Sequence, residues 1–121
     1  MNRPFVVAAV LLLSVACSRD QGLKTIEDGE EFAKSRGVVL TEKTEDKDQI
    51  VAPRGYSYTT GAEVHVGIFQ FNSPDAAQAY KKAMDDIPLG GEVFIQNGTI
   101  VFIVWGGSDQ ERQKMISALS Q

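Results

Sequence analysis

Few side chains in this sequence have the types or the spacing that chemistry requires. His65 is the only histidine and Cys17 the only cysteine, so no histidine pair and no Cys-x-x-Cys motif can hold a metal ion. The acidic residues Glu63, Glu92 and Asp109 are the best candidates for a small hydrolase. Acid–base catalysis by carboxyl groups needs a cleft that shifts their pKa, and no sequence feature indicates one. We therefore expect no catalytic activity, no metal and no cofactor, and we interpret His65 as an ordinary strand residue.

The N-terminal residues have the order of an export signal. A basic start, Met1-Asn2-Arg3, is followed by an apolar run from Phe5 to Leu13 and then by Ser14-Val15-Ala16-Cys17. This run is too short for a transmembrane helix, which needs about 20 apolar residues, but it suits a signal peptide. We predict a cleaved signal peptide over residues 1–16.

The cleavage site has two interpretations, and both place the cleaved bond directly before Cys17. Ser14 and Ala16 satisfy the small-x-small rule of an ordinary secretory signal. Leu13-Ser14-Val15-Ala16-Cys17 also resembles the lipobox of bacterial lipoproteins, which implies a lipid on Cys17. A lone thiol is unusual in an exported protein, so we favour the lipid anchor. In an envelope with two membranes, Ser18 in place of aspartate favours the outer membrane.

The remaining chain is long enough for one small domain. We expect a tether over 17–24 and a single domain over 25–121. The formal net charge is −4, which argues against nucleic acid as a partner. An acidic balance also gives no attraction to an anionic bilayer, so the expected link to the membrane is the lipid.

Periodicity and turn signals predict an α+β domain. Ser73-Pro74-Asp75 starts a helix, Ser108 starts the last helix, and Asn97-Gly98 is the two-residue turn of a hairpin that pairs Gln96 with Thr99. The order of elements favours a two-layer sandwich, in which an antiparallel sheet of about four strands has its helices packed on one face. The predicted helices are 25–36, 74–87 and 109–119, and the predicted strands are 38–43, 50–58 (interrupted by Pro53 and Gly55), 63–71, 92–96 and 99–105.

The two faces of this sheet differ in composition. One face is aliphatic, with Val64, Val66 and Ile68 alternating along a strand, and should receive the helices. The other is too apolar for a wetted face, so either the chain covers it or it binds a partner. The cover could be the first helix, the loop through Tyr56 and Tyr58, or a second subunit. The residues predicted for a partner-binding face are Phe69, Phe71, Phe94, Val101, Ile103 and Trp105.

The segment from Gly55 to Leu119 resembles a class of small bacterial lipoproteins of uncharacterised function. The shared features are Tyr58, a strand ending in Phe69 or Phe71, Asp75-Ala76-Ala77, Asn97-Gly98 and a final helix that contains Ile116. The resemblance implies a lipid-anchored envelope protein and supplies no catalytic residue.

Three functions are compatible with these features. The favoured one is a lipid-anchored binding or interaction module of the cell envelope, with an envelope protein or a small apolar ligand on the second sheet face. The second is a structural or regulatory accessory subunit of an envelope complex. The third, which we disfavour, is a small extracytoplasmic hydrolase.

Overall fold

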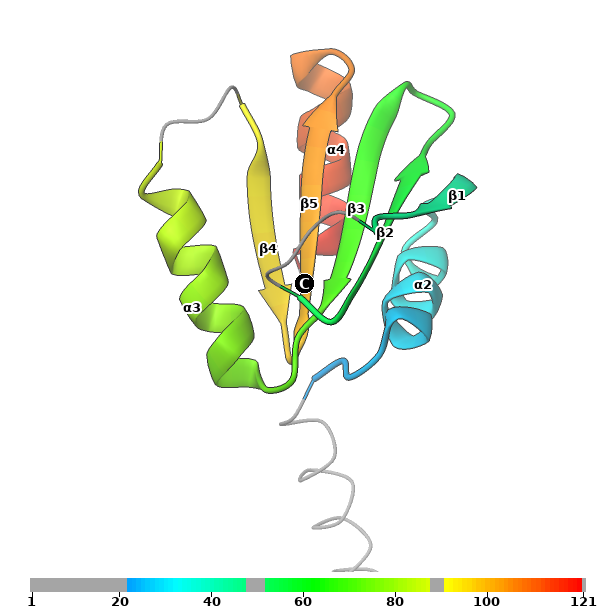
Figure 1. The fold of residues 1–121 in the computed structure, drawn as a ribbon. Coiled ribbons are helices and arrows are strands. Elements are labelled where there is room, and N and C mark those ends of the chain that lie inside the picture. Colours follow the sequence, from blue (N-terminus) through cyan, green and yellow to red (C-terminus); the bar gives the residue numbers. More distant parts are fainter. Residues whose placement is uncertain (1–21, 48–51, 88–90, 121) are drawn as a thin grey trace, which may run out of the picture.

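A computed structural model describes residues 22–47, 52–87 and 91–120. These residues form an antiparallel sheet of five strands with three helices (Figure 1). The α+β class is confirmed, and the sheet has one strand more than the approximate number expected. In chain order the elements are α2 (Ile26–Ser35), β1 (Thr41–Glu45), β2 (Arg54–Thr59), β3 (Val64–Gln70), α3 (Pro74–Asp85), β4 (Val93–Asn97), β5 (Ile100–Gly106) and α4 (Asp109–Leu119).

The strands lie in the order β1-β2-β3-β5-β4. β3 and β5 pair from Val64–Gly106 to Gln70–Ile100 and form the centre of the sheet. The edge strand β1 is exposed throughout and starts three residues later than predicted. Val38 is the reason, because its amide donates to Ala33 O at 2.9 Å and its side chain is buried in the helix-side core rather than in a strand.

The aliphatic face receives α2 and α4, as expected. Thr25 and Asp28 form a capping box at the start of α2, which satisfies backbone amides that a helix N-terminus leaves free. Ile26 and Ala33 of α2 and Leu119 of α4 are buried against the sheet. The sheet residues beneath them are Val64, Val66, Ile68, Ile100, Phe102 and Val104.

The third helix corrects the expectation that all helices share one face. Ala77, Tyr80 and Met84 of α3 pack on the opposite side, against Phe94 and its neighbours. The strand order explains this placement. β5 is antiparallel to both β3 and β4 and lies between them, so α3 connects two parallel strands. Such crossovers keep one hand, which fixes the face that the helix covers.

The hairpin register also differs from the prediction. Asn97 pairs with Ile100, so the two turn residues are Gly98 and Thr99. Gly98 has φ +67°, whereas Thr99 is not among the residues with positive φ. A type II′ turn has this pattern, with glycine at its first central position. The predicted register differs by two residues, an even number, so the assignment of side chains to the two faces is unchanged.

Gly29 allows α2 to approach the sheet closely. A Cβ atom at this position would lie 2.9 Å from Ile68 Cγ2 and 3.6 Å from Ile100 Cγ2. Gly61, in the turn between β2 and β3, has nothing within 4 Å of an added Cβ and no positive φ. Replacement by alanine therefore places the same methyl group in a crowded position at Gly29 and in an open position at Gly61.

We expect Gly29→Ala to destabilise the domain by about 1–3 kcal/mol, because overpacking against Ile68 outweighs the gain of about 1 kcal/mol in helix propensity. Gly61→Ala is the matched control and should be neutral or slightly stabilising. Urea unfolding measures both. A Gly29→Ala variant more stable than the wild type would show that α2 does not need glycine at this contact.

Candidate functional site

The predicted partner-binding face is a second core in the structure. Phe69, Phe71, Phe94, Val101 and Ile103 are all at most 7% exposed. Tyr80 and Met84 of α3 pack against them, so α3 is the main cover, an element that the sequence analysis did not consider. These five residues are therefore unavailable to a partner in the folded chain.

The remaining predicted site residues are scattered. Trp105 is half-buried and stacks on His65 with ring centroids 5.4 Å apart. Asp109 is ion-paired with Arg112 at the start of α4, whereas Glu63 precedes β3 and Glu92 precedes β4. Within residues 22–47, 52–87 and 91–120, no three His, Cys, Asp or Glu side chains are placed to hold a metal ion. Cys17 lies outside the described residues.

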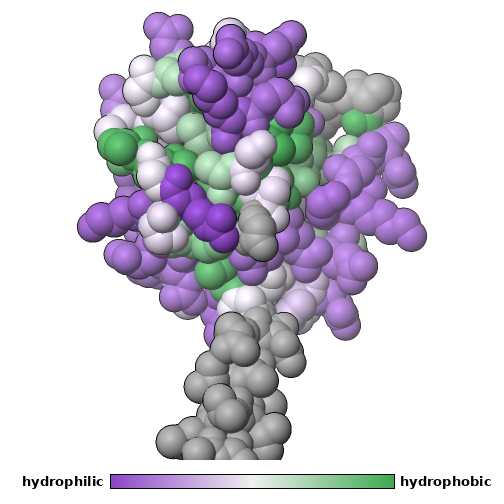
Figure 2. All heavy atoms as spheres, turned by 180° about the vertical axis from the view of Figure 1, so that it is seen from behind, coloured by the Kyte–Doolittle hydropathy of each residue, from purple (hydrophilic) through white to green (hydrophobic). Residues whose placement is uncertain are grey.

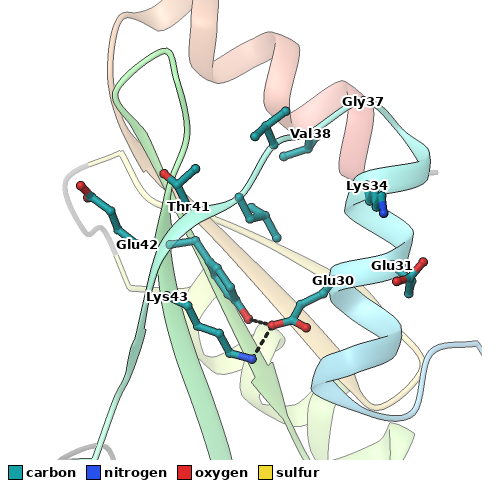
Figure 3. A pocket seen from close by; sticks show the side chains of 11 residues that line it. Glu30, Glu31, Lys34, Gly37, Val38, Thr41, Glu42 and Lys43 are labelled. Carbon is teal, nitrogen blue, oxygen red and sulfur yellow. Dashed lines mark hydrogen bonds and ion pairs between the residues drawn. The ribbon is translucent and has the colours of Figure 1, made fainter.

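A pocket of about 560 Å³ lies between α2 and the strands β1 and β2. Figure 3 shows that helix α2 and the segment leading into β1 form its two sides. Glu30 and Lys43 point toward one another, whereas Glu31 and Glu42 point away from the centre. The pocket lining consists of Glu30, Glu31, Lys34, Gly37, Val38, Val39, Leu40, Thr41, Glu42, Lys43 and Tyr58.

One carboxylate organises the polar side of this pocket. Glu30 Oε2 accepts a hydrogen bond from the Tyr58 hydroxyl and lies 2.7 Å from Lys43 Nζ. Tyr58 is only 3% exposed. Burial, and then the hydrogen bond to Glu30, raises the pKa of Tyr58 well above its usual value near 10. Tyr58 therefore stays protonated and acts as a donor.

A second acidic residue of α2 anchors the helix to β2. Arg54 Nη2 lies 3.2 Å from Glu27 Oε2, and the hydrogen bond from this guanidinium lowers the pKa of the Glu27 carboxyl. Both Lys43 and Arg54 contact the ring of Tyr56, at 4.5 Å and 5.7 Å from its centroid. These partly exposed charges add little stability individually, but together they keep α2 aligned with β1 and β2 beside the pocket.

The apolar side of the pocket is the segment between α2 and β1. Val38 is buried and Leu40 half-buried, whereas Val39 is 69% exposed. Val39 also borders a second hollow, of about 370 Å³, that reaches Met115 and Ala118 of α4. Seen from behind the sheet, hydrophobic residues gather between strongly polar areas (Figure 2). The arrangement can hold an apolar group and offer it hydrogen bonds at one end.

The sequence analysis missed this pocket. It assigned Val38 to the first strand and Tyr58 to an interrupted strand, and it gave Glu30 no role. The one available signal in the sequence was the apolar run Val38-Val39-Leu40, which follows the first helix. In the structure only one of these three side chains is buried in the core, so the run supplies more apolar surface than the core takes up.

Comparisons of the chain with protein families, with curated proteins and with solved structures found no match. Among the described residues, no helix is both long enough and apolar enough to cross a membrane. The interpretation of the pocket therefore depends on its own chemistry.

We expect Tyr58→Phe to cost about 1–2 kcal/mol of stability at neutral pH, since it removes a buried hydrogen bond to a charged group. The raised pKa of Tyr58 also sets a pH dependence. Below pH 10 the contribution of Tyr58 to the stability of the fold is fully present. Above pH 10 the unfolded tyrosine ionises while the folded one keeps its proton, so stability falls. Urea unfolding at neutral and alkaline pH should show a smaller alkaline loss for Tyr58→Phe than for the wild type.

Tyr80→Phe is the matched control for the neutral-pH measurement, because the Tyr80 hydroxyl has no hydrogen bond within the described chain. Burial also raises the pKa of Tyr80, so this variant should lose only the Tyr80 share of the alkaline dependence, while the share of Tyr58 remains and stability at neutral pH is unchanged. Equal stability of Tyr58→Phe and the wild type at neutral pH would contradict the assigned hydrogen bond.

Proposed function

We propose that this chain is a non-catalytic binding module of the bacterial cell envelope, exported by its N-terminal signal and held by a lipid on Cys17. The observation that carries the proposal is the pocket between α2 and β1–β2. It combines an exposed aliphatic residue, Val39, with a fixed polar network beneath it. The bound group would be an apolar part of an envelope protein or of a small ligand.

The polar network supports binding rather than catalysis. The Glu30 carboxylate is already engaged by Tyr58 and Lys43, and Tyr58 retains its proton far above neutral pH. A general base or a nucleophile needs a pKa close to the working pH. Tyr58 does not meet this requirement, and the Glu30 carboxylate already has two donors, so both groups suit a fixed binding surface.

The first described residues leave the pocket accessible in an anchored protein. Thr99 N donates to Leu23 O at 2.9 Å, and Leu23 N donates to Asn97 Oδ1 at 3.3 Å. The chain therefore enters the domain at the β4–β5 turn, the lower end in Figure 1. Val39 borders a hollow with Gly61 of the β2–β3 turn, at the other end of the sheet. A tether at residues 17–24 would present the Val39 end away from the membrane.

The alternative of an accessory subunit rests on the same surface. An exposed Val39 between two hollows suits a protruding apolar side chain of a permanent partner as well as a transient ligand. The two functions differ in stoichiometry, because an accessory subunit has one partner in constant ratio.

The anchor predicts the distribution of the protein after cell fractionation. Cys17→Ala should move most of the protein from the membrane to the soluble fraction, because it removes the lipid attachment site. Immunoblotting of both fractions measures the shift, and Cys17→Ala combined with a foreign transmembrane segment is the control for restored attachment. Unchanged membrane association of Cys17→Ala would refute the lipid anchor.

If the pocket at Val39 is the binding site, the bound partner or ligand lies next to the Val39 side chain. A photoreactive benzoyl-phenylalanine at Val39 should yield one dominant adduct in living cells. The same group at Gln78, on the exposed side of α3, should yield none. A protein adduct of constant stoichiometry would favour the accessory subunit, and a small-molecule adduct the ligand-binding module. Equal labelling from both positions would remove the support for a binding surface around Val39.

A further inference from the structure

Another hollow, distinct from the two beside Val39, lies on the opposite face of the sheet, over β1, β2 and β3. Helix α3 contacts β4 and β5 and so covers the other half of this face. The pairs Thr44–Ser57 and Thr59–His65 bring four polar side chains to one surface. They line a hollow of about 220 Å³, together with Glu42 and Tyr58.

One wall of this hollow is aromatic. His65 stacks on Trp105 with an angle of 19° between the rings and 5.4 Å between their centroids. Gly67, which pairs with Ser57, carries no side chain, and an added Cβ would lie 3.5 Å from the Trp105 ring. A flat imidazole backed by an indole thus forms this wall, and the Trp105 ring covers the buried backbone of Gly67. Stacked rings of this kind offer an apolar surface with fixed geometry.

Three polar side chains of the hollow are free to bind a ligand, whereas the Thr44 hydroxyl donates to Glu42 O at 3.2 Å. Within the described residues, the Ser57 and Thr59 hydroxyls and the His65 nitrogens have no hydrogen-bond partner, and none of the three side chains is fully exposed. A hydroxyl can donate and accept, and so can a neutral imidazole. The hollow therefore presents both kinds of hydrogen-bonding group within the span of two strands.

The charges select the class of ligand. Glu42 is the one carboxylate among the described residues that line the hollow, and no lysine or arginine lines it, so an anion such as phosphate would be repelled. A purely apolar ligand would leave the hydroxyls without partners, which is costly where water is displaced. A neutral saccharide fits both limits, because its ring offers an apolar face of C–H groups and a rim of hydroxyls.

We propose that the hollow formed by Thr44, Ser57, Thr59 and His65 binds one ring of a neutral saccharide. The apolar face of the sugar lies against the His65 imidazole, and its hydroxyls bond to Ser57 and Thr59. Glu42 accepts a further hydroxyl. The hollow shares Glu42 and Tyr58 with the lining of the pocket at Val39, but Ser57, Thr59 and His65 belong to the hollow alone, so substitutions at these three residues test the saccharide site by itself.

Trp105 is the only tryptophan and reports on this site through its stacking with His65. Titration of the purified protein with cellotetraose or chitotetraose should change Trp105 emission in a saturable way. Isothermal titration calorimetry should give the same dissociation constant. Thr59→Val removes one hydroxyl at nearly constant volume and should weaken binding about three- to tenfold, the value of one hydrogen bond. His65→Ala should weaken it further.

Lys34→Ala, in the Val39 pocket, is the control and should bind the saccharides as the wild type does. Circular dichroism of each variant checks that the fold is intact, and Ser57→Ala replaces any variant that does not fold. Absence of saturable binding to both saccharides in the millimolar range would overturn the proposal. Tighter binding of inorganic phosphate, or equal affinity of Thr59→Val and the wild type, would also overturn it.

Discussion

The pairing of β3 with β5 is the constraint on which the structure depends. Both strands are buried on both of their faces, with Val66 and Phe102 on one side and Phe69 and Val101 on the other. A central pair of this kind cannot leave either face open to water. Two helices cover the first face and α3 covers part of the second. The uncovered part of the second face is where small and hydroxyl-bearing residues replace the apolar ones.

The sequence predicts local elements better than their arrangement. The caps at Thr25 and Ser73 and the alternation of Val64, Val66 and Ile68 depend on neighbouring residues, and the structure has each of them. The position of α3 depends on β5 inserting between β3 and β4. No local sequence pattern encodes this insertion, since a hairpin has the same turn and strand signals whether its second strand lies at the edge or in the centre of the sheet.

The sites were harder to predict for a related reason. The aromatic residues Phe69 and Phe94 attracted attention because they are large and apolar, yet such residues are most often core. The pocket at Val39 depends on how the segment after α2 turns back onto Ala33, and the hollow at His65 depends on which strands α3 leaves uncovered. Both arise from tertiary packing, and single residue types do not reveal them.

The attachment of Leu23 to the β4–β5 turn has a mechanical consequence. A pull on the N-terminus would first load the bonds from Leu23 to Asn97 and Thr99, and Thr99 is continuous with the central strand β5. Helix α2 follows only after Lys24, whose carbonyl is itself held by Thr99 Oγ1 at 2.8 Å. Tension on a tethered domain would thus be borne by the middle of the sheet, and α2 with its pocket would be shielded until that clamp opened.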